Sequence, residues 1–181
     1  MIPDEKTVKR MWDKYHLPLD KKIHCEMVRK VVLYIARKIN EKNFDYRVNE
    51  HLLIASALLH DIDKNIDKLP GECHPDAGVR ILKLEGMDEV AEMIRTHPLH
   101  MICDSNQAFW TIEQKILFLA DKMTKQNIIG LEKRFGLWRS EDDDDASHRI
   151  LDASYPKVVA LRDEILQLAG ITEEELILLM K

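Results

Sequence analysis

Residues 51–64 read HLLIASALLHDIDK, an apolar run that ends in the pair His60-Asp61. A run this rich in Leu, Ile and Ala is normally buried in a folded domain. Burying an unpaired carboxylate is costly, so an aspartate at this position needs a hydrogen-bond donor or a cation. A His-Asp pair by itself is more often a structural, hydrogen-bonded pair than a metal site. The choice between the two interpretations depends on the rest of the chain.

Four more side chains of the metal-binding type lie along the chain, at His24, His74, His97 and Asp121. Imidazole nitrogens and carboxylate oxygens bind divalent transition metals. Together with His60-Asp61 they make six candidate ligands in one small domain, which is enough for two ions. The sequence therefore favours a two-metal hydrolase over a structural pair.

The spacing of apolar residues predicts an all-α fold. Apolar residues recur three and four apart, and no Asn-Gly or Asp-Gly hairpin signal separates alternating runs. Further helices are predicted over about 75–84 and 88–95. A helix that opens at His24 and ends near Asn40 is indicated by Val28, Val31, Val32, Ile35 and Ile39.

Four of the candidate ligands are predicted near helix ends. The pair at 60–61 closes the helix formed by the apolar run. Pro75 is a favoured first helical residue, which places His74 near an N-cap. Pro98 disfavours helical geometry at the residue before it, so His97 is expected at a helix end.

The second half of the chain predicts three more helices. Thr111 and Gln114 form a potential capping box, and the helix that they open should carry Asp121 near its middle, pointing into the bundle. Residues 152–168 and 172–180 have the periodicity of two C-terminal helices that pack on the core. Neither contributes a candidate ligand.

Composition places limits on the class of protein. The 181 residues are 45% hydrophobic and 33% charged, which predicts one soluble globular domain over 1–181. A net charge of −5 without a dense Lys/Arg cluster argues against nucleic acid as a partner. No stretch approaches the roughly 20 apolar residues of a membrane helix, and MIPDEKTVKRMWDKY lacks the apolar core of a secretory signal. We expect a cytoplasmic protein without a membrane partner; a homodimer stays open.

Three cysteines, Cys25, Cys73 and Cys103, form no CxxC pair, so the sequence indicates neither a disulfide framework nor a structural zinc site. Cys25 and Cys73 adjoin His24 and His74, but a free cysteine is most often a small buried apolar residue.

The order of the candidate ligands, H…HD…H…H…D, resembles the two-metal branches of the HD superfamily of metal-dependent phosphohydrolases over roughly residues 20–130. HDIDK (60–64) and HPDAGVRIL (74–82) are similar to segments of the YqeK-like symmetrical diadenosine-tetraphosphate hydrolases. Asp63 departs from that branch, which usually has a small or aromatic residue there, and TKQN (124–127) replaces an EPNR-like stretch. The resemblance implies an HD-domain helical bundle.

The resemblance also implies two ligand sets that share one carboxylate. One ion would be held by His24, His60, Asp61 and Asp121, and the other by Asp61, His74 and His97. The ions would acidify a shared water and present hydroxide to phosphorus. Four imidazoles and two carboxylates suit transition metals better than magnesium. We expect iron first, with manganese, cobalt, nickel or zinc as alternatives.

A phosphate substrate needs further positive partners. Lys64 lies one helical turn beyond His60, and the resemblance supports a role for it in catalysis together with Asp61, although an ordinary surface lysine is an equal alternative. His100, Lys122 and Arg134 are weaker candidates for substrate binding. Trp110, Trp138 and Tyr155 could stack on a base, but aromatic residues spread over a helical chain are more often part of the core.

Three functions follow from these patterns. The first is a phosphohydrolase that acts on a nucleotide or another small phosphorylated metabolite, with a dinucleoside tetraphosphate as the first named candidate. The second is a mixed-valent di-iron oxygenase, since oxygenases of the same superfamily use a similar ligand set. The third is a nucleotide-binding sensor without turnover. Lys64 and the HDxxK resemblance favour the phosphohydrolase.

Overall fold

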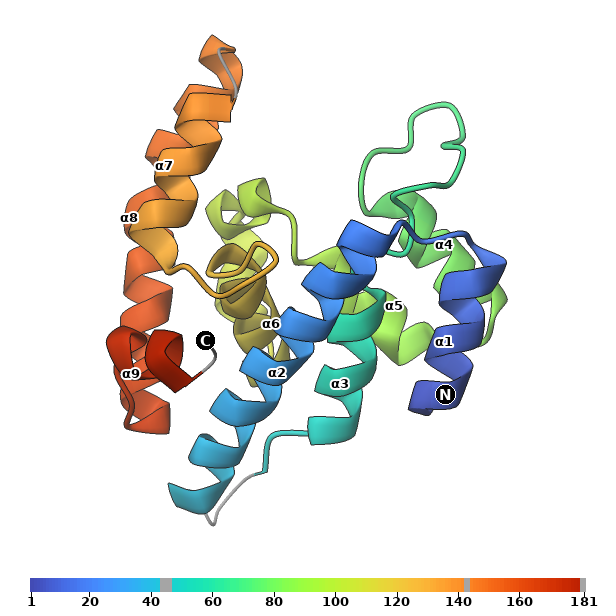
Figure 1. Ribbon diagram of the computed structural model, residues 1–181. Coiled ribbons are helices and arrows are strands. Elements are labelled where there is room, and N and C mark those ends of the chain that lie inside the picture. The colour runs from blue at the N-terminus through green and yellow to red at the C-terminus, as the bar shows by residue number, and fades with distance from the viewer. Residues whose placement is uncertain (43–46, 142–143, 180–181) are drawn as a thin grey trace.

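The computed structural model describes residues 1–42, 47–141 and 144–179. Within these ranges all regular elements are helices and none is a strand, which confirms the predicted all-α class. Figure 1 shows their arrangement. The elements are α1 (Glu5–Lys14), α2 (Leu19–Lys42), α3 (Glu50–Leu59), α4 (Asp76–Leu84), α5 (Asp88–Arg95), η1 (Leu99–Cys103), η2 (Ser105–Phe109), α6 (Ile112–Lys122), α7 (Leu131–Glu141), α8 (Asp145–Ala169) and α9 (Glu173–Leu179).

The long helix α2 forms the centre of the fold. It packs against α3, α6 and α8, and its predicted apolar stripe from Val28 to Ile39 is fully buried (Figure 1). The helix begins at Leu19, five residues earlier than predicted. His24 therefore lies in the second turn of α2 and not at its start.

Helix ends fix the places of the other candidate ligands. His60 is the C-cap of α3, as predicted. Pro75 is the N-cap of α4, so His74 lies in the loop one residue earlier than expected. The capping box of Thr111 and Gln114 is present at the start of α6. That helix ends at Lys122, so Asp121 lies in its last turn and not near its middle.

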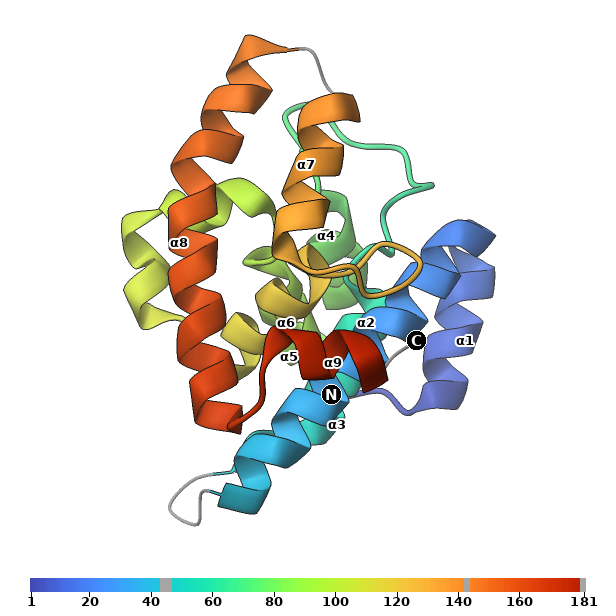
Figure 2. The ribbon, with the colours of Figure 1, turned by 60° about the vertical axis from the view of Figure 1, so that its left-hand side comes forward.

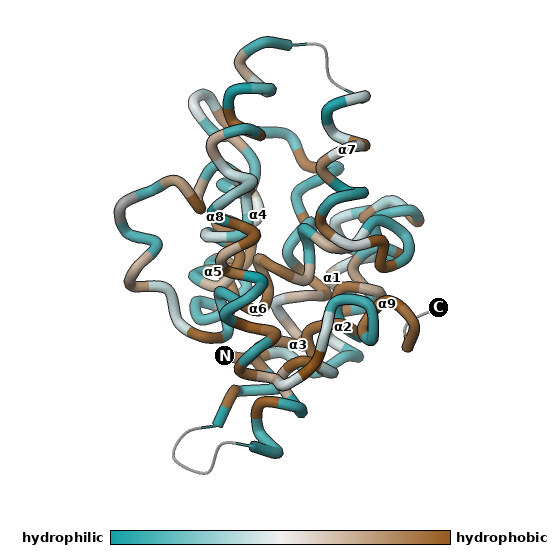
Figure 3. Tube along the Cα trace, turned by 90° about the vertical axis from the view of Figure 1, so that its left-hand side faces the viewer, coloured by the Kyte–Doolittle hydropathy of each residue, from teal (hydrophilic) through white to brown (hydrophobic). Residues whose placement is uncertain are grey.

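The buried apolar side chains of the described residues form two cores. The larger core is built from α2, α3 and α6 together with α7, α8 and α9. The smaller core joins α1, α4 and α5 to the other face of α3. In the hydropathy trace of Figure 3 the helices alternate between apolar and polar segments, as expected for helices that bury one face.

The C-terminal helices stand beside the larger core. Figure 2 shows α8 running along the molecule, with α7 and α9 next to it. Helix α8 begins at Asp145, seven residues before the predicted start. Helices α1 and α7 were not predicted from the sequence. Among the described residues, no helix is long and apolar enough to cross a membrane.

Candidate metal centre

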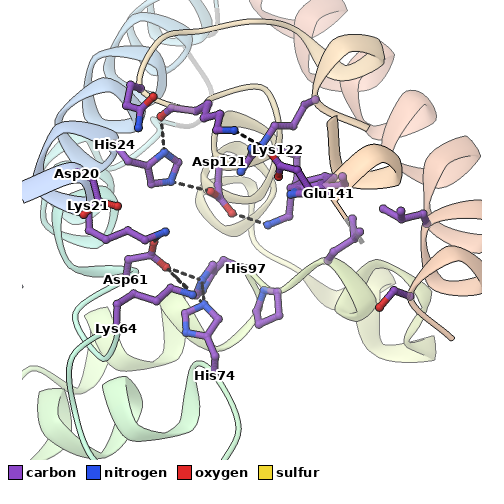
Figure 4. A pocket seen from close by; sticks show the side chains of 18 of the residues that line it. Asp20, Lys21, His24, Asp61, Lys64, His74, His97, Asp121, Lys122 and Glu141 are labelled. Atoms are coloured by element: carbon purple, nitrogen blue, oxygen red, sulfur yellow. Dashed lines mark hydrogen bonds and ion pairs between the residues drawn. The ribbon is translucent and has the colours of Figure 1, made fainter. Parts of the chain in front are cut away.

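The six predicted ligands meet in one place, although they come from five segments of the chain. Figure 4 shows five of them pointing toward a common cavity. His24 comes from α2, His60 and Asp61 follow α3, His74 precedes α4, His97 follows α5, and Asp121 ends α6. The apolar run before His60 is buried, as predicted, and this burial places the pair inside the molecule.

Two groups of three ligands are close enough to hold an ion each. His24, His60 and Asp121 form one group and Asp61, His74 and His97 form the other; within each group the ligand atoms lie within 4.8 Å of one another. All six are buried except His74, which is partly exposed. These are the only such groups in the described part of the chain, and neither contains a cysteine.

Asp61 connects the two groups. Its Oδ1 lies 3.5 Å from Nε2 of His74, 4.0 Å from Nε2 of His97 and 4.0 Å from Nε2 of His60. The same carboxylate contacts the ammonium groups of Lys21 and Lys64, each at 3.3 Å. Asp61 therefore belongs to the second group and comes within 4.0 Å of the first group at His60.

Hydrogen bonds determine which nitrogen of each imidazole faces the cavity. Nδ1 of His24 donates to the main-chain oxygen of Lys125 at 2.7 Å. Nδ1 of His60 and of His97 donate in the same way to the oxygens of Ala57 and Ile94, at 2.8 and 2.5 Å. A carbonyl oxygen can only accept, so Nδ1 carries a proton in each ring and Nε2 is the nitrogen that faces the centre.

The facing Nε2 atoms provide the test of whether metal ions fit. Nε2 of His24 lies 3.2 Å from Nε2 of His60 and 3.0 Å from Oδ1 of Asp121. Nε2 of His74 lies 2.8 Å from Nε2 of His97. Lone pairs at these distances repel unless a proton or a metal ion lies between them. Two nitrogens about 2.1 Å from one ion and at right angles to each other are about 3.0 Å apart, so the donor set fits.

The surroundings hold both carboxylates in their charged form. Burial would raise the pKa of Asp121, but Lys122, His24 and His60 lower it well below its usual value. Burial likewise opposes ionisation of Asp61, yet His60, Lys64 and Lys21 hold its pKa below the usual range. Ligand carboxylates must be deprotonated to bind an ion, and the lowered pKa values of Asp61 and Asp121 favour that form.

The surroundings shift the pKa values of His97 and His60 in opposite directions. Burial and the neighbouring His60 lower the pKa of His97 well below its usual value, so this ring is neutral and ready to ligate. Burial also disfavours a charge on His60, but Cys25, Asp61 and Asp121 raise its pKa well above the usual value. The position of His60 therefore favours a positive charge, which either a proton or a metal ion can supply.

A cavity of about 690 Å³ opens above the two groups. Its charged lining includes the predicted Lys64, Lys122 and Arg134. The ammonium group of Lys122 is buried and pairs with Asp121. The guanidinium of Arg134 lies over the ring of Trp138, 4.5 Å from its centroid, and its buried Nε has no hydrogen-bond partner among the described residues.

Two predicted site residues do not line the cavity: His60, which is fully buried, and His100. His100 is exposed on η1 and is absent from the cavity lining, because the short helix after Pro98 turns its side chain away. Of the aromatic candidates, Trp138 lines the cavity, whereas Trp110 is buried against Phe118 in the core.

Several residues of the site were not found by the sequence analysis. Lys21 lines the cavity and pairs with Asp61; it precedes His24 by one helical turn, so helical spacing could have indicated it. Lys125 contributes a main-chain oxygen, which no side-chain pattern reveals. Cys25 is fully buried beside His60, and burial raises the pKa of its thiol, which fits the predicted role as a small apolar residue.

The fold and the site define the class of protein: an all-α metal-binding domain built around a histidine-aspartate pair. The family model of the HD domain matches residues 22–125, more than half of the chain, so this chain belongs to the HD domain family. No curated protein and no solved structure matched. Members of this family are mostly metal-dependent hydrolases that bind divalent ions, which supports phosphohydrolase activity in general. The match ends before α7, so Arg134 and Trp138 lie outside it.

Proposed function

We propose that this protein is a metal-dependent phosphohydrolase that cleaves a phosphate ester or anhydride of a nucleotide or another small phosphorylated metabolite. The observation that carries this proposal is the pair of ligand groups joined by Asp61 at the floor of a cavity lined with lysines. Two cation sites beside the lysines Lys21, Lys64 and Lys122 suit a phosphate substrate, which carries several negative charges.

The donor set specifies what the site would hold. One ion would be ligated by His24, His60, Asp61 and Asp121, and the second by Asp61, His74 and His97. The mixture of imidazole and carboxylate suits iron first, with manganese, cobalt, nickel or zinc as alternatives. Ions held there would acidify a water and offset negative charge on a phosphate.

The lysines of the cavity are the natural partners of the phosphate. Lys21 and Lys64 contact Asp61, and Lys122 pairs with Asp121. A dication on either carboxylate would compete for the same oxygens, and the ammonium groups would then be available to phosphate oxygens. We assign Lys64 to stabilising the negative charge that develops on the phosphate during cleavage. We assign Lys122 to binding the phosphate.

The part of the cavity away from the ligand groups would bind the part of the substrate beyond its phosphate. A volume of about 690 Å³ lies within the range of about 300–1,000 Å³ that is usual for small-molecule sites, and it exceeds what one phosphate group needs. Trp138, Ile150 and Leu151 form an apolar wall on α7 and α8. Both features support an organic group as large as a nucleoside, and we retain a dinucleoside tetraphosphate as the first compound to test.

The experiment is product analysis on protein prepared without oxygen, loaded in turn with iron, manganese, cobalt or nickel, and given a panel of nucleotides and dinucleoside polyphosphates. We expect metal-dependent hydrolysis that needs no oxygen. Asp61→Asn and His60→Ala should abolish turnover and leave the helical circular dichroism unchanged. His51→Ala is the matched control. His51 is exposed in the first turn of α3, the helix that ends at His60, and it lies outside the cavity lining.

Three other results would contradict the proposal. Near-normal activity of Asp61→Asn would remove the assigned centre. Turnover that requires oxygen and only iron would identify an oxygenase, which can use a similar ligand set. Nucleotide-induced stabilisation without product in every metal state would identify a sensor.

A further inference from the structure

His74 is held differently from the other three imidazoles. The rings of His24, His60 and His97 donate to main-chain oxygens. Nδ1 of His74 instead lies 2.8 Å from Oδ1 of Asp63, a carboxylate. Asp63 is itself buried, with a relative exposure of 2%. It is also the residue at which the HDIDK segment departs from the HDxxK segments that it otherwise resembles.

The position of His74 explains why this ring needs an outside partner. His60 and His97 each follow a helix and bond the oxygen three residues earlier, so their own helices anchor them. His74 lies in the loop between α3 and α4 and is the most exposed of the four rings. Asp63, at the other end of that loop, supplies the anchor that a helix end supplies elsewhere.

Among the described residues, the carboxylate of Asp63 has one hydrogen-bond partner, which is His74. The second oxygen of Asp63 is buried and has no hydrogen-bond partner in the described ranges, so His74 is the one side chain that the carboxylate serves there. Helix α4 packs directly on this turn: a Cβ added at Gly78 would lie 3.3 Å from Cγ2 of Ile62 and 3.6 Å from Cβ of Asp63.

We propose that Asp63 is a positioning residue for the second ion. By accepting the Nδ1 proton, it fixes the ring so that Nε2 faces Asp61 and His97, and its charge makes the ring a better donor. Outer partners of this kind typically raise metal affinity about 10–100-fold. The proposal rests on the metal centre of the proposed function, but not on hydrolysis or on any substrate.

The alternative is that Asp63 only ties the loop down, and the chain offers a matched control for it. Glu72, in the same loop, is bonded to Arg80 of α4 at 2.6 Å and does not contact any ligand. Glu72→Ala would loosen the loop and leave His74 with its carboxylate. Asp63→Ala removes the carboxylate, whereas Asp63→Asn keeps an accepting oxygen and removes the charge.

The first readout is calorimetric titration of the apoprotein with Mn²⁺ and Co²⁺, which resolves the two ions. Asp63→Ala should lower the affinity for the second ion about 10–100-fold and leave the first unchanged. Asp63→Asn should lose less, and Glu72→Ala should lose neither. An unchanged second affinity in Asp63→Ala, or an equal loss in Glu72→Ala, would overturn the proposal. Asp63→Asn keeps the test decisive if Asp63→Ala does not fold.

The second readout is the imidazole tautomer, measured by ¹⁵N-resolved NMR on the apoprotein. His74 should carry its proton on Nδ1 in the wild type and shift toward Nε2 in Asp63→Ala, while the other three rings stay as they are. An unshifted His74 would overturn the proposal. A wild-type chain that binds only one ion would overturn it too, yet would leave a one-ion hydrolase standing. Failure of hydrolysis with both readouts positive would overturn the proposed function alone.

Discussion

At the scale of single residues, the geometry of a helix end explains how two of the ligands are presented. The last carbonyl oxygens of a helix have no partner within it. His60 and His97 each follow a helix and donate Nδ1 to such an oxygen, which leaves Nε2 pointing away from the helix axis. The same bond therefore satisfies the helix and selects the tautomer that can bind a metal.

Arg134 offers a prediction at this scale. Burial lowers its pKa, while the charges of Asp121, Glu141 and Asp61 act in the opposite direction, so its guanidinium lies within the field of the proposed ligands. Arg134→Ala should lower phosphate affinity about 10–100-fold, because a hydrogen bond to a charged group contributes about 1.5–3 kcal/mol. Product inhibition by inorganic phosphate measures this affinity directly.

The control for this prediction is Arg139→Ala. Arg139 lies on the same helix but is exposed and pairs with Asp152 of α8. Its removal should leave phosphate inhibition unchanged. Equal phosphate inhibition of Arg134→Ala and the wild type would exclude Arg134 from the binding site.

The residues that carry metal chemistry were predictable, and the residues that support them were not. His24, His60, Asp61 and Asp121 are recognisable because their chemistry and order are unusual. His100 was a weaker candidate than His97 in the sequence, and its exposed place on η1 keeps it out of the cavity lining. The role of Asp63 depends on a contact across an eleven-residue separation, which spacing along a helix or strand does not encode.

At the scale of elements, α4 is placed by a glycine. Gly78 lies on the face of α4 that meets Ile62 and Ile94, and a Cβ there would come within 3.2 Å of Cδ1 of Ile94. This contact is closer than ordinary packing. The absence of a side chain at Gly78 therefore lets α4 approach the turn that carries Asp61 and Asp63.

Two glycine substitutions should have opposite effects on stability. Gly78→Ala should destabilise the fold, because overpacking costs about 1–3 kcal/mol and outweighs the gain in helix propensity. Gly136→Ala in α7 should stabilise it by about 0.5–1 kcal/mol, since nothing lies within 4 Å of the added Cβ. Urea unfolding of both variants measures these free energies. Stabilisation by Gly78→Ala comparable to that by Gly136→Ala would show that α4 is not tightly packed there.

Short helices bounded by turn residues were predicted more accurately than the long ones. The bounds of α4 and α5 were predicted to within one residue, whereas α2 begins five residues earlier than its apolar stripe indicated. The capping box gave the start of α6 correctly. Helix α7 was missed because Gly136 weakens its helical propensity and only Leu131 and Phe135 are buried along it. The end of α6 was misplaced because nothing in the sequence after Asp121 stops a helix until Gly130.

At the scale of the whole molecule, the metal centre should couple stability to pH. An ion at about 100 times its Kd adds about 2.7 kcal/mol to the free energy of unfolding. That corresponds to about 2–4 °C in Tm for each kcal/mol in a chain of this size. We expect this gain with Mn²⁺ relative to chelator at about pH 8. We expect the gain to shrink as the pH falls, and the loss to begin above the usual imidazole pKa of about 6.5, because the pKa of His60 is raised.

The physical reason is competition between the ion and protons. Burial opposes a charge on His60, but its neighbours raise its pKa, so an ion must displace a proton there, and more so in acid. Asp61 and Asp121 have pKa values below their usual range despite burial and stay charged over the same interval. Thermal unfolding at about pH 5.5 and about pH 8 measures the effect. A gain as large at the lower pH as at the higher would contradict it.

The ligands of the proposed metal centre come from elements of both apolar cores. His24 and Asp121 belong to helices of the larger core, whereas His74 and His97 are held by α4 and α5 of the smaller one. Asp61 belongs to the second group and lies 4.0 Å from His60 of the first. A pair of ions joined by this carboxylate would act as a cross-link between the two cores, closing chain segments as distant as residues 24 and 97. Protein loaded with both ions would then unfold in one cooperative transition, and removal of the ions would remove this link between the two cores.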